Sequence, residues 1–150
     1  MVTEGAPAPD FDLVADDGSR VKLSDLRGKK VVLYFYPKDD TPGCTKQACE
    51  IRDRIEEFDA HDALVFGISP DDVASHKKFK QKFDLNFPLL SDEGHKVADA
   101  YGVWKQNSFY GVKYWGNERT SFIIDENGNV AKILRKVKPG AHADQVLGLV

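Results

Sequence analysis

The chain of 150 residues has little cysteine and no long apolar run: its two cysteines are Cys44 and Cys49. Two cysteines cannot build the dense disulfide framework of a small secreted domain. No run approaches the roughly 20 apolar residues that a membrane helix needs, and the first residues lack the pattern of a signal peptide. We therefore expect no membrane association and a reducing, cytoplasmic compartment, where a cysteine pair is more often catalytic or metal-binding than structural.

Strong positive charge and recognisable metal or nucleotide motifs are also lacking. The net charge of −3 offers no general attraction for nucleic acid, so we expect no nucleic-acid partner. The spacing of Cys44 and Cys49 does not match a zinc motif, and the histidines are scattered at no ligand spacing. No glycine-rich loop suited to a phosphate is visible. We therefore expect neither a metal nor a cofactor, because a thiol needs neither for its own chemistry.

The apolar residues that are present predict one α/β domain spanning residues 1–150. Continuous apolar runs at 31–36 and 63–69 are typical of strands that are buried on both faces. Helical spacing follows each run, at about 42–59 and from about 73 to 83. This alternation predicts a central mixed sheet with helices on both faces.

The remaining segments contain weaker signals. Turn residues predict two hairpins, one pairing 11–14 with 20–23 and one spanning 121–134. Pro88 restricts the run 87–90 to an edge or irregular strand. Helices are expected from about 93 to 101 and from about 141 onward. Residues 103–118 resist assignment, because their aromatic side chains are scattered among Gly, Lys and Asn.

The stretch from Pro37 to Cys49 delivers a cysteine to the start of a helix. Thr41 suits the N-cap position, where its hydroxyl can accept a hydrogen bond from an early backbone N–H. Pro42 would be the first helical residue, which places Cys44 third, within the first turn. Unsatisfied N–H groups and the helix dipole favour a thiolate there. The order of residue types therefore indicates an activated nucleophile, although an inert buried cysteine remains the alternative.

Cys49 lies five residues later, on a different face of the same predicted helix. Helix geometry separates the two Cα atoms by roughly 8.5 Å, whereas a disulfide needs them within about 7 Å. Cys44 shares an apolar stripe with Ala48 and Ile51, and Cys49 shares a face with charged residues. A bond between the cysteines would therefore require the first turns of the helix to unwind.

The motif Pro37…Thr41-x-x-Cys44 resembles the active-site signature of the peroxiredoxins, and Cys49 five residues on resembles the bacterioferritin-comigratory (Q-type) subfamily. The similarity covers nearly the whole chain. It includes flanking segments at 6–11, 65–69, 87–92 and 119–125. The resemblance implies a thioredoxin-like fold, with a central mixed sheet, flanking helices and an N-terminal β-hairpin extension.

The resemblance also implies a thiol-dependent peroxidase that reduces hydrogen peroxide and organic (alkyl) hydroperoxides. Cys44 would become a sulfenic acid, and Cys49 would resolve it as an intramolecular disulfide. Thioredoxin or a similar dithiol protein would then reduce the disulfide by exchange. Because such resolution needs no second subunit, we expect a monomer.

Three further site residues follow from the resemblance. The Thr41 hydroxyl would bind the thiolate and the incoming peroxide, with capping as a secondary role. Pro37 would shield the thiolate from water. Arg119 would lie beside Cys44, where its fixed cation stabilises the thiolate and orients the peroxide. By sequence alone, an arginine before an apolar strand is usually a surface charge.

Other functions remain open from the residues themselves. Oxidation of Cys44 could switch a non-enzymatic redox sensor or holdase by unwinding its helix. Cys49 could be a bystander, with an external thiol reducing Cys44 directly. A disulfide oxidoreductase is a weaker alternative, because its cysteines are normally separated by two residues rather than four.

Overall fold

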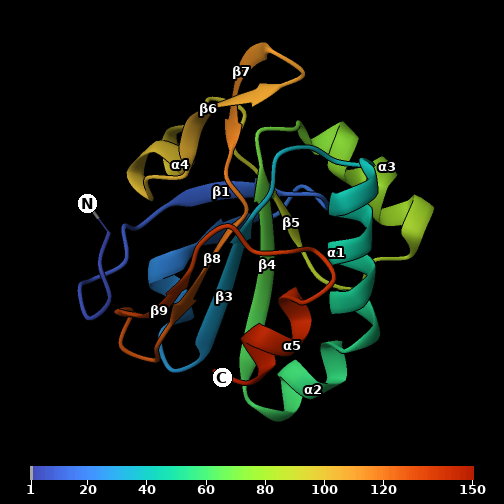
Figure 1. The fold of residues 1–150 in the computed structure, drawn as a ribbon. Helices are drawn as coiled ribbons and strands as arrows, with labels where there is room; N and C mark the ends of the chain where they lie inside the picture. Colours follow the sequence, from blue (N-terminus) through green and yellow to red (C-terminus); the bar gives the residue numbers. More distant parts are fainter. Residues whose placement is uncertain (1) are drawn as a thin grey trace.

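The computed structural model describes residues 2–150, which contain a seven-stranded mixed sheet (Figure 1). Its strand order is β2-β1-β5-β4-β3-β8-β9. The central strands β3, β4 and β5 are parallel, and the β1–β2 and β8–β9 hairpins join them in antiparallel pairs. The strands are β1 (Asp12–Ala15), β2 (Arg20–Lys22), β3 (Lys30–Phe35), β4 (Ala63–Ser69), β5 (Leu89–Ser91), β8 (Thr120–Ile124) and β9 (Val130–Leu134).

Helices cover both faces of this sheet, as predicted (Figure 1). The helices on one face are α1 (Pro42–Asp53), α2 (Ile55–Ala60), α3 (Val73–Phe83) and α5 (His142–Leu147). The other face is covered by α4 (Lys96–Ala100), the 3-10 helix η1 (Leu23–Leu26) and the N-terminal segment. Among residues 2–150, no helix combines the length and apolar character needed to cross a membrane.

Strand β3 shows why the sheet is buried on both sides. Its side chains alternate between two cores: Val31, Leu33 and Phe35 pack into one, and Val32 and Tyr34 pack into the other. All five are at most 1% exposed. The prediction of a strand that is buried on both faces is therefore confirmed. Burial of each large apolar side chain contributes about 1.5–3 kcal/mol, so β3 forms a rigid support for the loop that follows it.

The predicted helix at 42–59 is instead two helices. The backbone leaves helical geometry at Arg54, with φ −121° and ψ 15°. Its N–H donates to the carbonyl of Ile51 at 3.0 Å, three residues back, and its guanidinium pairs with Glu57 and with Asp144 of α5. These interactions close α1 tightly and allow α2 to start in a new direction.

Two weaker predictions also needed correction. β5 is an interior strand rather than an edge strand, because Pro88 precedes its first residue and β1 pairs with its free side. Helix α4 begins at Lys96 rather than near residue 93. His95 is left-handed, with φ 50°, and the Asp92 carboxylate accepts from the N–H groups of Val97 and Ala98.

The unassigned segment 103–118 forms a separate two-stranded sheet. β6 (Trp104–Phe109) and β7 (Val112–Asn117) pair antiparallel and project from one edge of the main sheet in Figure 1. Exposed side chains such as Trp115 leave this ribbon without the alternating buried face by which strands are recognised in a sequence. Asn117 Nδ2 donates to the Tyr36 carbonyl at 3.2 Å, which joins the ribbon to the end of β3.

Candidate active site

Cys44 lies in the first turn of α1, where the sequence predicted it. Thr41 is the N-cap residue, with extended backbone (φ −99°, ψ 155°), and Pro42 is the first helical residue. The Cys44 side chain is 1% exposed and packs in the core cluster that contains Tyr34 and Tyr36. The thiol is therefore shielded from solvent and faces the positive end of the helix dipole.

Arg119 reaches this thiol through the register of the sheet. Phe35 at the end of β3 pairs with Thr120 at the start of β8, so Arg119 lies at the edge of the sheet where the chain leaves β3 for α1. Its Nη2 donates to Cys44 Sγ at 3.2 Å. A guanidinium remains charged at every ordinary pH and favours a thiolate at this distance. The expected proximity of Arg119 and Cys44 is thus present in the fold.

Gln47 and Gly43 help to place Arg119 beside Cys44, and neither residue was predicted from the sequence. Arg119 Nη1 donates to Gln47 Oε1 at 2.9 Å, so the buried amide fixes the second arm of the guanidinium. A Cβ on Gly43 would lie 2.8 Å from Arg119 Nη2, so glycine allows the cation to approach the helix start. Gln47 could have been found as a polar residue three positions after Cys44, on the same helix face.

Thr41 and Pro37 occupy the loop before α1. The expected side-chain cap is absent from the described structure. The Thr41 hydroxyl instead donates to the Lys38 carbonyl at 2.9 Å, because the left-handed backbone at Asp40 (φ 56°) closes a turn between these residues. The hydroxyl must rotate before it can donate to a thiolate or peroxide. Pro37 follows the last β3-side core residue, Tyr36, and is half-buried.

Cys49 lies in α1 together with Cys44, and both thiols are free. Cys44 is buried, whereas Cys49 is half-buried. The helix runs unbroken from Pro42 to Asp53, so both cysteines keep the helical separation that prevents a disulfide. Chemistry that joins them must first unwind the beginning of α1.

Two buried polar side chains, Tyr34 and His142, lie close enough to Arg119 and Cys44 to respond to their charges. His142 Nε2 lies 2.6 Å from Ser121 Oγ, and burial, followed by the charge of Arg119, lowers the pKa of His142 from 6.5 to about 4. Burial, followed by the negative charge of Cys44, raises the pKa of Tyr34 well above 10. Both groups are therefore neutral at pH 7, and the positive charge next to Cys44 is carried by Arg119.

Two other features of the described structure resemble ligand sites. Asp39, Asp71 and His76 lie close enough together to share a cation. However, the Asp39 carboxylate already accepts from Tyr36, Ser75 and His76, and Asp71 accepts from Ser69 and from the Asp39 N–H. These satisfied contacts make the group a hydrogen-bonded network of the protein itself.

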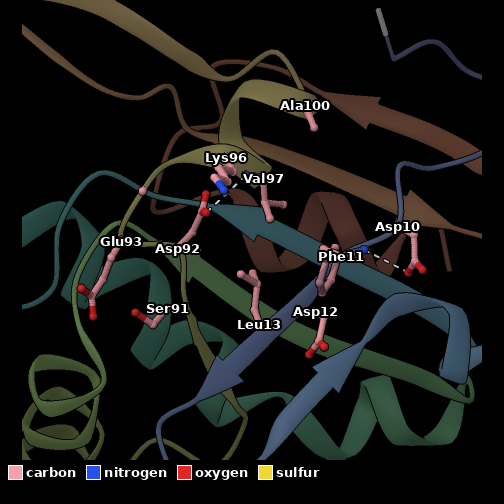
Figure 2. Close-up of a pocket in the computed structure, with 11 residues that line it drawn as sticks. Asp10, Phe11, Asp12, Leu13, Ser91, Asp92, Glu93, Lys96, Val97 and Ala100 are labelled. Atoms are coloured by element: carbon pink, nitrogen blue, oxygen red, sulfur yellow. Dashed lines mark hydrogen bonds between the residues drawn. The ribbon is translucent and has the colours of Figure 1, made fainter.

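A pocket of about 430 Å³ lies at the other core, lined by β1, the end of β5 and α4 (Figure 2). Cys44 is not among its lining residues. Figure 2 shows that its Asp10 and Asp92 carboxylates are bound to backbone N–H groups of Phe11 and Val97. These acidic groups stabilise the local backbone, and the pocket contains no nucleophile comparable to Cys44.

Comparison with known proteins places this geometry in a family. The profile of the AhpC/TSA family matches residues 5–133. "Peroxiredoxin Bcp" of Bacillus subtilis is 50% identical over 143 residues, covering 95% of this chain and 91% of that protein. "Peroxiredoxin Bcp" of Escherichia coli K12 is 45% identical over 143 residues, covering 95% and 92%.

Solved structures agree with these sequence matches. The bacterioferritin comigratory protein of Xanthomonas campestris superposes with a TM-score of 0.90 at 36% identity, covering 99% of this chain and 96% of that one. A Cys-to-Ser variant of the Xylella fastidiosa peroxiredoxin Q gives a TM-score of 0.93 at 33% identity, covering 99% and 94%. The thioredoxin-like fold is thereby confirmed.

The family assignment carries the activity with it. Peroxiredoxins are thiol-dependent peroxidases that act on peroxides and are recycled by a thioredoxin-type reductant. The match extends over almost the full length of this chain and of its relatives, and the chain has a buried cysteine in contact with an arginine at a helix start. The protein therefore belongs to the AhpC/TSA family, as a thiol-dependent peroxidase of the bacterioferritin-comigratory (Q-type) peroxiredoxins.

Proposed function

We propose that Cys44 is the residue that attacks the peroxide. Its thiolate sulfur forms a bond to one peroxide oxygen while the O–O bond breaks, and the other oxygen leaves as water or an alcohol after taking a proton. The sulfur is oxidised to a sulfenic acid and the peroxide is reduced. The hydrogen bond from Arg119 to Sγ is the observation that carries this proposal, because the same cation can stabilise the charge that moves onto the leaving oxygen.

Thr41 and Pro37 have supporting roles in this proposal. After rotating away from the Lys38 carbonyl, the Thr41 hydroxyl donates to the thiolate or to the bound peroxide. Pro37 contributes an apolar, donor-free wall that keeps water from the sulfur. Both residues lie within the short loop between β3 and α1, so they can act at the same sulfur without a long-range movement.

Cys49 is proposed as the resolving residue. Once the first turns of α1 unwind, its thiol attacks the sulfenic sulfur of Cys44, a disulfide forms and water leaves. A dithiol protein then opens this disulfide by two exchange steps and leaves with a disulfide of its own. Cys44 and Cys49 are the two cysteines of the chain, so an internal disulfide can join no other pair.

This cycle fits one domain, residues 1–150, that acts as a monomer in a reducing compartment such as the cytoplasm. One continuous sheet contains strands from the first to the last third of the chain, which supports a single cooperative unit. Resolution within one chain needs no partner subunit. The substrates proposed are hydrogen peroxide and alkyl hydroperoxides, with thioredoxin as the reductant.

The test is to treat the reduced protein with one equivalent of hydrogen peroxide and to measure intact mass and free thiols. Loss of two hydrogens and of both thiols is expected. Cys44→Ser should abolish peroxidase activity with the fold intact, and Cys49→Ser should gain one oxygen, complete one turnover and stop cycling with thioredoxin. Full cycling by the Cys49 variant would overturn the resolving role, and activity of the Cys44 variant would overturn the nucleophile.

A further inference from the structure

The loop that carries Thr41 to α1 is fastened to the protein at Asp39. The Asp39 carboxylate accepts hydrogen bonds from Tyr36 Oη at 2.6 Å, Ser75 Oγ at 2.8 Å and His76 Nδ1 at 2.7 Å. The side chains of Asp39 and His76 are 3% and 0% exposed. This buried contact joins the loop to β3 and to α3, five residues before the reactive cysteine.

The surroundings of His76 define its protonation state. Its Nε2 lies 2.9 Å from the Leu90 carbonyl of β5, which can only accept a hydrogen bond. Its Nδ1 faces the Asp39 carboxylate, which Tyr36 and Ser75 already treat as an acceptor. Both ring nitrogens therefore carry protons, and His76 and Asp39 form a buried ion pair.

The charges around His76 agree with this ion pair. Burial alone lowers the pKa of His76, but the hydrogen bond and charge of Asp39, with a smaller contribution from Asp71, raise it above 6.5. Tyr36, directly after β3, remains a neutral donor, because burial and then the Asp39 charge raise its pKa well above 10. The β5 side contributes the Leu90 carbonyl.

The anchor stops at Asp39. Its backbone N–H is also bound, by the Asp71 carboxylate at 2.8 Å. The next contacts along the chain are exposed: Lys82 pairs with Asp40, and Thr41 donates to Lys38. Exposed contacts contribute little to stability. The chain is thus firmly held up to Asp39 and weakly held from Asp40 to the start of α1. This weakly held segment directly precedes the first turns of α1, which must unwind before Cys44 can meet Cys49.

We propose that His76 is a positioning residue: through its contact with Asp39 it holds the loop so that Cys44 lies beside Arg119 during the peroxide step. When the start of α1 unwinds, the His76–Asp39 contact stays in place and keeps the preceding end of the loop fixed. The inference rests on the proposed role of Cys44 and adds a residue of α3 to the machinery. It separates the two chemical steps: oxidation of Cys44 needs the anchored loop, whereas disulfide formation needs the first turns of α1, which follow the loop, to unwind.

The variant His76→Phe tests this role, because it keeps an aromatic ring and removes both N–H donors. The reduced protein is mixed rapidly with hydrogen peroxide, the reaction is quenched at successive times, and intact mass is measured. The time course gives separate rates for the gain of oxygen and for the later formation of the disulfide. We expect Cys44 oxidation to slow by about tenfold or more, since a displacement of about 1 Å can cost up to a hundredfold. The rate of disulfide formation should be unchanged or faster.

A double variant separates positioning from general stability. His76→Phe leaves the Asp39 carboxylate without its buried partner, so Asp39→Asn in the same chain should restore part of the lost stability. If His76 acts by position, the double variant still oxidises slowly although it unfolds at higher temperature. Val130→Ala, a cavity variant in the opposite core, controls for destabilisation alone and should oxidise at the wild-type rate.

The pH profile supplies a second readout. Because the pKa of His76 in the folded protein is raised, the rate advantage of wild type over Asp39→Asn should be full while His76 is protonated and should decline as the pH rises through that raised pKa. A wild-type oxidation rate in His76→Phe, or rates that follow stability in every variant, would overturn the proposal. If the wild-type protein formed no disulfide, the proposed resolving role of Cys49 would be wrong. The rates of Cys44 oxidation in the variants would still test the role of His76.

Discussion

His142 should make the protein lose stability in mildly acidic solution. The imidazole is 1% exposed at the start of α5, and burial, followed by the charge of Arg119, lowers its pKa from 6.5 to about 4. A lowered pKa means that the unfolded chain binds a proton at a pH where the folded chain does not. The contribution of neutral His142 is therefore complete above about pH 6.5 and is lost as the pH falls towards 4.

The size of the effect follows from the two pKa values. A difference of about 2.5 units corresponds to at most about 3.4 kcal/mol, and linkage gives a loss of about 2 kcal/mol between about pH 7 and pH 5. For a chain of this length, that loss lowers the melting temperature by about 4–8 °C. The carboxylates of the protein titrate in the same range, so the effect must be isolated with a variant.

Urea unfolding of wild type and His142→Gln at the two pH values provides that comparison. Wild type should lose about 2 kcal/mol more than the variant on acidification. His61→Gln, at an exposed position, is the matched control and should behave like wild type. Parallel losses in wild type and His142→Gln would refute the reasoning, because they would mean that the buried ring binds its proton as readily as a free histidine.

Two further predictions concern the cation at Cys44. In Gly43→Ala, the new Cβ would lie 2.8 Å from Arg119 Nη2, so Cys44 oxidation should slow about tenfold. The melting temperature should not fall, because alanine favours a helix by up to about 1 kcal/mol relative to glycine. An unchanged oxidation rate in stopped-flow measurements would contradict the close approach of Arg119 to Gly43. Arg119→Gln should slow oxidation by about a hundredfold, and Arg119→Lys should slow it less, because lysine keeps the charge without the planar fork that also binds Gln47. Equal rates in the two Arg119 variants would argue against a role for the charge.

The features that the sequence predicted well depend on neighbouring residues. The run 31–36 indicated a strand buried on both faces, because such a strand needs apolar side chains at every position. Thr41 and Pro42 indicated a helix start, which placed Cys44 in its first turn. The spacing of Cys49 showed that a disulfide requires unwinding, since helix geometry alone fixes that separation.

Predictions were weaker where structure depends on contacts that lie outside the local segment. Nothing near Pro88 shows that β1 will cover the free side of β5, and the exposed ribbon β6–β7 has no apolar period to reveal it. The side chain of Thr41 binds Lys38 rather than a helix N–H, because the left-handed turn at Asp40 directs it there. Arg54 ends α1 through contacts that include Asp144, 90 residues away.

The sequence by itself determined the type of fold and the position of Cys44 in the first turn of a helix, and its resemblance to the peroxiredoxins implied the family and Arg119. Only the tertiary structure decided what surrounds the sulfur. The pairing of β3 with β8 brings Arg119 to Cys44 across 75 residues, Gln47 turns inward to bind it, and His76 reaches Asp39 from another helix. Such contacts arise from sheet register and helix packing, which join distant residues, whereas sequence patterns report the preferences of residues close together in the chain.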